Sequence, residues 1–192
     1  MAIEQRVAAV LRGRHVGGID FHLGGFHVSA SRLDCVAKAI EERRITIRIA
    51  NTGNLLSAGY SPHSNHITLG SENAPDNVMG QASIVHECVH AMSDLYMCTQ
   101  LTELSDEAAA YLTEVVFLRT VGHWVSGGAP AMAIYNAADT LAKARGLRTT
   151  RGVKLTWADY EPLRRAIHAH PAYSGLSWMQ RTSGHGVPAA AP

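Results

Sequence analysis

The chain has 192 residues, of which 46% are hydrophobic and 17% charged, and its formal net charge is +1. These values predict one globular domain with a substantial core. The near-zero charge argues against electrostatic attraction to nucleic acid or to an anionic membrane. No apolar run approaches the length of a membrane span. Histidine is the one compositional oddity, with eleven residues.

The first residues of the chain do not resemble a secretory signal. The segment MAIEQRVAAVLRGR lacks a basic region followed by an uninterrupted apolar stretch. Its apolar residues fit one face of a helix instead: Ile3, Val7, Val10 and Leu11. The three cysteines form no disulfide framework: Cys35, Cys88 and Cys98. We therefore expect the protein in the cytoplasm, or exported by a route that needs no signal peptide.

The first part of the chain predicts two helices joined by a glycine-punctuated segment. A helix is expected over 2–12, where Gly13 ends it. The segment RHVGGIDFHLGGFH, residues 14–27, reads as loop or short strand. A second helix over 32–43, with Ser31 as its N-cap, places its apolar residues on one face.

A small sheet is expected next. ITIRI, residues 45–49, alternates apolar and polar side chains as a half-buried strand does. The turn sequences NTGN and SPHSN separate it from LLSAGY, residues 55–60, and from HITLG, residues 66–70. The three segments predict a meander or hairpin sheet.

Four helices are expected after the sheet. They are predicted over 78–97, over 106–121, from Pro130 to Gly146, and from between Thr156 and Glu161 to a point before Pro171. Asp76 or Asn77 is placed to cap the first, while Ser105 and Gly122 would bound the second.

The whole pattern predicts the α+β class, with a small N-terminal sheet with helices followed by a helical C-terminal half. No repeat or linker divides the chain, so residues 1–182 are expected to form one domain. Residues 183–192 are rich in small residues and proline and are expected to be a mobile tail.

The stretch IVHECVHAMSD, residues 84–94, carries the strongest chemical signal. His86 and His90 are four residues apart on a predicted helix, so both imidazoles project from one face and can reach a single zinc ion. Glu87 lies beside the first histidine and can take a proton from a water, which is the chemistry of the H-E-x-x-H pattern. The alternative is an apolar helix with two hydrogen-bonded core histidines, but burying these polar groups without partners would be costly.

A catalytic zinc site needs a third protein ligand. The segment ELSDEAAAYLTE offers Glu103, Asp106, Glu107 and Glu114. We expect Glu107 to be the ligand, since it falls in the first turn of the next predicted helix and small alanines follow it. Asp106 and Glu107 also suit the positive end of a helix dipole. Asp94 is expected either to hydrogen-bond a histidine or to be solvated.

A family resemblance rests on these residues. HECVH, an acidic residue on a following helix and a short strand before the motif resemble the zincin metallopeptidases, particularly the glutamate-ligand branch called gluzincins. HECVHAMSD followed by DEAAAYLTE is also similar to small bacterial HExxH proteins, some of which are toxin or effector domains. The likeness covers about residues 45–120 and departs from the family at Tyr111, where gluzincins have an acidic residue.

The resemblance implies a zincin-like fold and a peptide or protein substrate. HITLG would be the edge strand that pairs with an extended peptide. A cognate inhibitor or immunity protein would be a further partner if the domain is an effector. Related zinc peptidases use a histidine or tyrosine after the third ligand to stabilise the oxyanion, and five residues are candidates here: Tyr160, His168, His170, Tyr173 and, more weakly, His123.

The sequence therefore predicts a zinc-dependent hydrolase, with a peptidase favoured and Glu87 as general base. Two alternatives stay open. The first is a zincin-fold binding or regulatory module with weak or absent catalysis. The second is a structural zinc site, which would need four protein ligands, although Cys88 points away from the two histidines on a helix.

Overall fold

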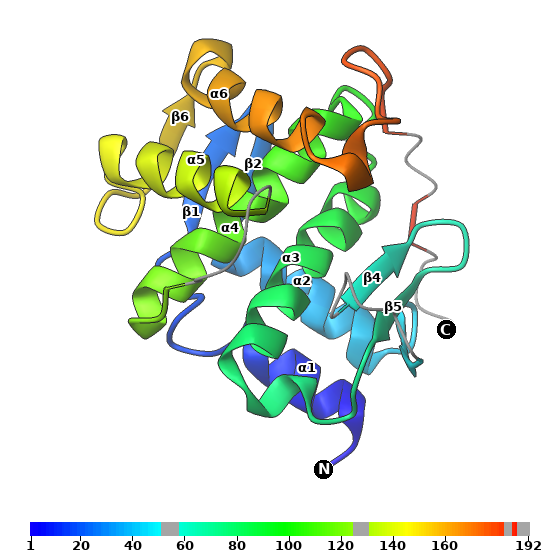
Figure 1. The fold of residues 1–192 in the computed structure, drawn as a ribbon. Helices are drawn as coiled ribbons and strands as arrows, with labels where there is room; N and C mark the ends of the chain where they lie inside the picture. The colour runs from blue at the N-terminus through cyan, green and yellow to red at the C-terminus, as the bar shows by residue number, and fades with distance from the viewer. Residues whose placement is uncertain (51–57, 125–130, 183–185, 188–192) are drawn as a thin grey trace.

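The computed structural model describes residues 1–50, 58–124, 131–182 and 186–187. In this part of the chain six α-helices and two three-stranded sheets are present, which confirms the predicted α+β class (Figure 1). The expected turn NTGN, the expected helix start at Pro130 and most of the expected tail over 183–192 lie outside the described residues.

The first sheet joins an N-terminal hairpin to a strand from the second half of the chain. β1 (Asp20–Leu23) and β2 (Phe26–Ser29) form an antiparallel hairpin, and β6 (Val153–Leu155) pairs with β1 in parallel. Gly24 and Gly25 form the hairpin turn, both with positive φ, a conformation that glycine adopts without strain. The C-terminal half is expected to contain helices alone, and this expectation is wrong because β6 is a strand. β6 has only three residues, which is too short to show a strand periodicity.

The second sheet has the order β3-β5-β4, from β3 (Thr46–Ile49), β4 (Ala58–Ser61) and β5 (His66–Leu69). β3 pairs with β5 in parallel and β4 pairs with β5 antiparallel. The expected hairpin is present in the antiparallel pair of β4 and β5, but a meander would place β4 in the middle and is wrong. The expectation that HITLG is an edge strand is also wrong. β5 has a partner on each side, which makes β4 the edge strand beside helix α3 (Val78–Leu95).

The N-terminal helices α1 (Ile3–Leu11) and α2 (Ala30–Glu41) pack against each other and against α3. Their apolar faces are buried, as the sequence pattern predicts. The N-cap of α2 is Ser29 and not Ser31: the Ser29 hydroxyl accepts the Arg32 backbone N–H at 3.4 Å. The helix starts two residues earlier than expected because the strand β2 runs directly into it.

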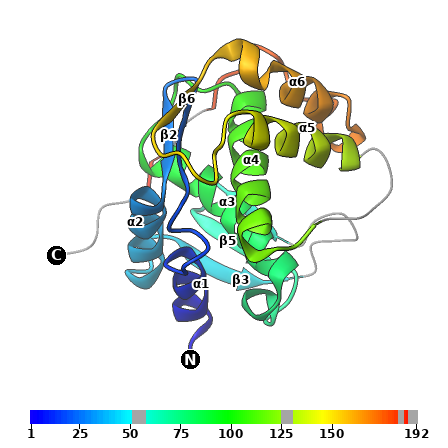
Figure 2. The same ribbon diagram turned by 90° about the vertical axis from the view of Figure 1, so that its left-hand side faces the viewer.

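Helix α3 lies at the centre of the molecule against α4 (Glu103–Val121), as Figures 1 and 2 show. Asn77 caps α3, as predicted, by accepting the Gly80 backbone N–H at 2.8 Å. Thr102, and not Ser105, caps α4, and Gly122 ends it in the left-handed conformation. The earlier start places Glu103 in the first turn of α4, one turn before Glu107.

The remaining helices cover the other side of α4. α5 (Ala131–Ala144) and α6 (Trp157–His168) both pack on α4 and on each other (Figure 1). Thr156 and Asp159 form a capping box at the start of α6, which agrees with the predicted start. Two short 3-10 helices complete the described elements, η1 (Ala74–Asp76) before α3 and η2 (Pro171–Tyr173) after α6. No helix within the described ranges is both long and apolar enough to cross a membrane.

Candidate metal centre

Helix α3 carries His86, Glu87 and His90 on the side that faces α4 and the cavity beside it. All three side chains are largely enclosed, and His86 is 7% exposed. The imidazole rings of His86 and His90 lie edge to face, with centroids 5.1 Å apart. The spacing of four residues therefore brings both rings to one place, as the sequence predicts.

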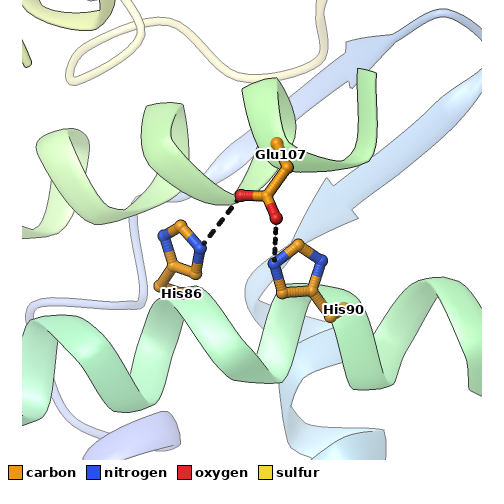
Figure 3. A group of neighbouring side chains, drawn as sticks. All are labelled: His86, His90 and Glu107. Atoms are coloured by element: carbon orange, nitrogen blue, oxygen red, sulfur yellow. Dashed lines mark ion pairs between the residues drawn. The ribbon is translucent and has the colours of Figure 1, made fainter. Parts of the chain in front are cut away.

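Glu107 on α4 lies opposite the two histidines (Figure 3). Its Oε2 atom is 3.5 Å from His86 Nε2, and its Oε1 atom is 3.8 Å from His90 Nε2. The three side chains offer ligand atoms that all lie within 4.8 Å of one another. This is the ligand set that the sequence predicts, drawn from two helices that are adjacent in the chain.

Two further carboxylates hold the outer nitrogens of the imidazoles. His86 Nδ1 is 3.0 Å from Glu114 Oε2, and His90 Nδ1 is 2.6 Å from Asp106 Oδ2. A carboxylate on Nδ1 fixes the ring orientation and places the proton there, which leaves Nε2 as the ligand atom. Asp106 and Glu114, both considered as ligands from the sequence, thus lie behind the histidines and not between them.

The carboxylates dominate the electrostatics of the metal-free site. Burial lowers the pKa of His86, but the neighbouring carboxylates of Glu107 and Glu114 outweigh burial and hold that pKa well above its ordinary value. Burial also lowers the pKa of His90. The negative charges of Asp106 and Glu107 outweigh burial and raise that pKa to about 9. The pKa of Glu107 is lowered, against burial, by the two histidines. The site therefore attracts positive charge strongly.

The residues fit a zinc ion. Glu107 Oε2 is buried, and its 3.5 Å contact with His86 Nε2 is too long for a good hydrogen bond, an arrangement that a cation between the two residues would complete. Two imidazoles and one carboxylate are a ligand set of catalytic zinc sites, which keep a coordination position for water or substrate. Cys88 is fully buried in the core and does not belong to the group.

A cavity of about 360 Å³ opens beside these residues. Its lining comes from α3, from the start of α4, from the edge strand β4 and from the segment after α6: Gly59, Tyr60, Pro62, His86, Glu87, His90, Ser93, Asp94, Glu103, Asp106, Glu107, Tyr173, Leu176 and Thr182. Glu87 is 8% exposed and has no hydrogen-bond partner among the described residues, so its carboxylate can accept a proton from a ligand in the cavity.

Of the candidate oxyanion donors, only Tyr173 lines the cavity. Its hydroxyl is 2.9 Å from the Tyr111 hydroxyl, and Tyr111 in turn packs edge to face on His86. The chain turns at Pro171 after α6, and η2 directs Tyr173 back toward α4. Burial, followed by the Glu107 carboxylate, raises the pKa of Tyr173, so its hydroxyl stays protonated.

The other four candidates have different surroundings. Tyr160 is 1% exposed and belongs to the core. His168 packs its ring on Trp178, and His170 accepts the Ala172 backbone N–H at 3.2 Å and so caps η2. His123 is exposed just past the end of α4. None of the four lines the described cavity.

The expectation that Asp94 is solvated is wrong. Asp94 is 4% exposed and accepts hydrogen bonds from the Tyr60 hydroxyl at 2.8 Å and the Gly186 backbone N–H at 2.9 Å. Asp106 holds His90.

Two tyrosines near the site are not indicated by the sequence pattern. Tyr60 lines the cavity, and the Tyr135 hydroxyl donates to Glu114 Oε1 at 2.8 Å. Both depend on contacts between distant segments.

Comparison of the chain with protein-family models, with curated proteins and with solved structures gives no match.

The role of Glu114 can be tested by Glu114→Gln. This change keeps the size of the side chain but removes the charge that orients His86. We expect zinc affinity, measured by competition with a chromophoric chelator, to fall ~10- to 100-fold. Glu72→Gln, a change of the same charge at an exposed position outside the cavity lining, should leave the affinity unchanged. Equal affinities of the two variants would refute the orienting role.

Proposed function

We propose that this protein is a zinc-dependent hydrolase, a metallopeptidase of the zincin type. The observation that carries the proposal is the orientation of the two histidines. The Nε2 atoms of His86 and His90 face the carboxylate of Glu107, while Glu114 and Asp106 hold both Nδ1 atoms. Two buried core histidines would also need partners, but they would not need a third carboxylate between their Nε2 atoms at 3.5 and 3.8 Å, which is longer than a good hydrogen bond.

Zinc bound by these three residues would supply Lewis acidity and lower the pKa of a water molecule. Glu87 then acts as the general base. It follows the first histidine on α3, lines the same cavity and lacks a hydrogen-bond partner among the described residues, so its carboxylate is available to receive the proton of the attacking water. It can return this proton to the leaving amine.

Tyr173 is the donor that we propose for the oxyanion of the tetrahedral intermediate. Its protonated hydroxyl lies in the cavity, and the Tyr111 hydroxyl at 2.9 Å holds it in place. A neutral hydroxyl aimed at the developing negative charge stabilises the transition state more than the ground state.

The edge strand β4 supports a peptide substrate. One of its edges pairs with β5, and no strand within the described residues pairs with the other. Gly59 and Tyr60 of β4 line the cavity that holds Glu87. An extended peptide that adds to this edge would place a scissile bond across the cavity through main-chain hydrogen bonds.

Glu87→Gln is the direct test of the proposed hydrolase. The amide keeps the shape of the side chain but cannot accept a proton, so zinc content should stay at the wild-type level while cleavage falls by ~10²-fold or more. Cleavage can be followed by mass spectrometry of new N-termini in a peptide library, with zinc measured in the same samples.

Glu72→Gln is again the matched control and should cleave as wild type does. Loss of zinc together with cleavage in Glu87→Gln would show that Glu87 is a ligand. Wild-type protein that holds zinc but cleaves no peptide in the library would contradict the peptidase proposal and favour a binding module.

Tyr173→Phe removes the proposed oxyanion donor, together with its hydrogen bond to Tyr111, and keeps the ring. We expect turnover to fall by ~10²–10³-fold with zinc content and melting temperature near wild type. Tyr160→Phe is the matched control, since Tyr160 is buried in the core outside the cavity lining. Tyr160→Phe should lower the melting temperature and leave turnover near the wild-type value. Wild-type turnover in Tyr173→Phe would rule out this donor.

A further inference from the structure

The cavity beside the candidate metal centre is strongly acidic. Five of its lining residues are carboxylates, Glu87, Asp94, Glu103, Asp106 and Glu107, and no lysine or arginine is among the described lining residues. A divalent cation held by neutral imidazoles would offset two of these negative charges. Of the carboxylates that remain, Glu87 serves as the general base and Asp106 orients His90, but the proposed hydrolase gives Glu103 no part.

Glu103 is a lining carboxylate that neither binds the metal nor orients a histidine in the proposed hydrolase. It is the first residue of α4, and with Asp106 and Glu107 it follows the spacing that places side chains on one helical face. Its side chain has no hydrogen bond or ion pair within the described chain, although it is partly buried and lines the cavity. Burial, followed by repulsion from Asp106 and Glu107, raises the pKa of Glu103.

One oxygen atom of Asp106, on the same turn, also lacks a hydrogen-bond partner among the described residues. Asp106 is 8% exposed, and its Oδ2 atom holds His90, while the oxygen without a partner is its buried Oδ1 atom. The positive end of the α4 dipole supplies only about half a unit of charge. It cannot balance both Glu103 and Asp106, so the charge at this end of the cavity is left for a ligand.

We propose that Glu103, with the charge of Asp106 behind it, forms a subsite for a cationic group of the substrate next to the scissile bond. This inference rests on the proposed function and names the substrate class. Glu103 precedes Glu107 by four residues, about 6 Å along the helix axis. An ammonium or guanidinium group bound there lies within one residue of the reacting carbonyl, as either the N-terminal amine or a lysine or arginine side chain.

Four amino-acid hydroxamates separate the two sources of charge. Lysine hydroxamate, norleucine hydroxamate and the Nα-acetylated form of each share one zinc-binding group and one unbranched four-carbon stem. They differ in whether they carry a side-chain ammonium and in whether the α-nitrogen is an ammonium or a neutral acetamide. Their dissociation constants for the zinc-loaded wild type, Glu103→Gln and Glu4→Gln are measured by isothermal titration calorimetry, which needs no turnover. Glu4 on α1 is outside the cavity lining and controls for the change in net charge.

We expect at least one positive charge to tighten binding to wild type by about 10-fold over N-acetylnorleucine hydroxamate, as for a charge-assisted hydrogen bond. The tighter singly charged ligand identifies the source. The advantage should largely disappear in Glu103→Gln and persist in Glu4→Gln. Equal affinities of all four ligands for zinc-loaded wild type, or an advantage that survives in Glu103→Gln, would overturn the subsite and leave the hydrolase proposal intact. A chain that takes up no zinc would overturn both.

Discussion

The site depends on the contacts between two enclosed histidines and three carboxylates at the interface of α3 and α4. His86 lies between Glu107 and Glu114, and His90 lies between Glu107 and Asp106. Charges removed from water are tolerated only when they have close partners of opposite sign. Each Nδ1 atom has such a partner. The Nε2 atoms and Glu107 Oε2 do not satisfy one another fully, and a cation between them would complete the interface.

The register of α3 against α4 maintains these contacts. A shift of one residue would rotate a side chain by about 100° and separate the histidines from their carboxylates. Caps at Asn77 and Thr102 fix where the two helices begin. Three fully buried alanines after Glu107 allow the close packing: Ala108, Ala109 and Ala110. The segment that carries Tyr173 is held in turn by the buried Arg164, which donates to the Trp178 carbonyl at 3.1 Å.

The parts of the site that follow from local geometry could be predicted from the sequence. The helical spacing predicts the paired histidines, and the grouping with Glu107 needs only that the next helix folds back on the first. The role of Glu114 could not be predicted, because it depends on how α3 and α4 face each other. Glu114 lies about two helical turns after Glu107 on α4, and its Oε2 atom is 3.0 Å from His86 Nδ1. The edge position of β4 was missed for the same reason, since it depends on a parallel pairing between β3 and β5 that leaves no local sequence signal.

Zinc content tests the central claim most directly. Purified wild-type protein, saturated with zinc and then dialysed, should retain one zinc ion per chain by mass spectrometry of the metal. His86→Ala and His90→Ala should each lose it while keeping the helical content of the metal-free protein. Wild-type protein that retains no zinc, or a double variant at His86 and His90 that retains as much as wild type, would contradict the account.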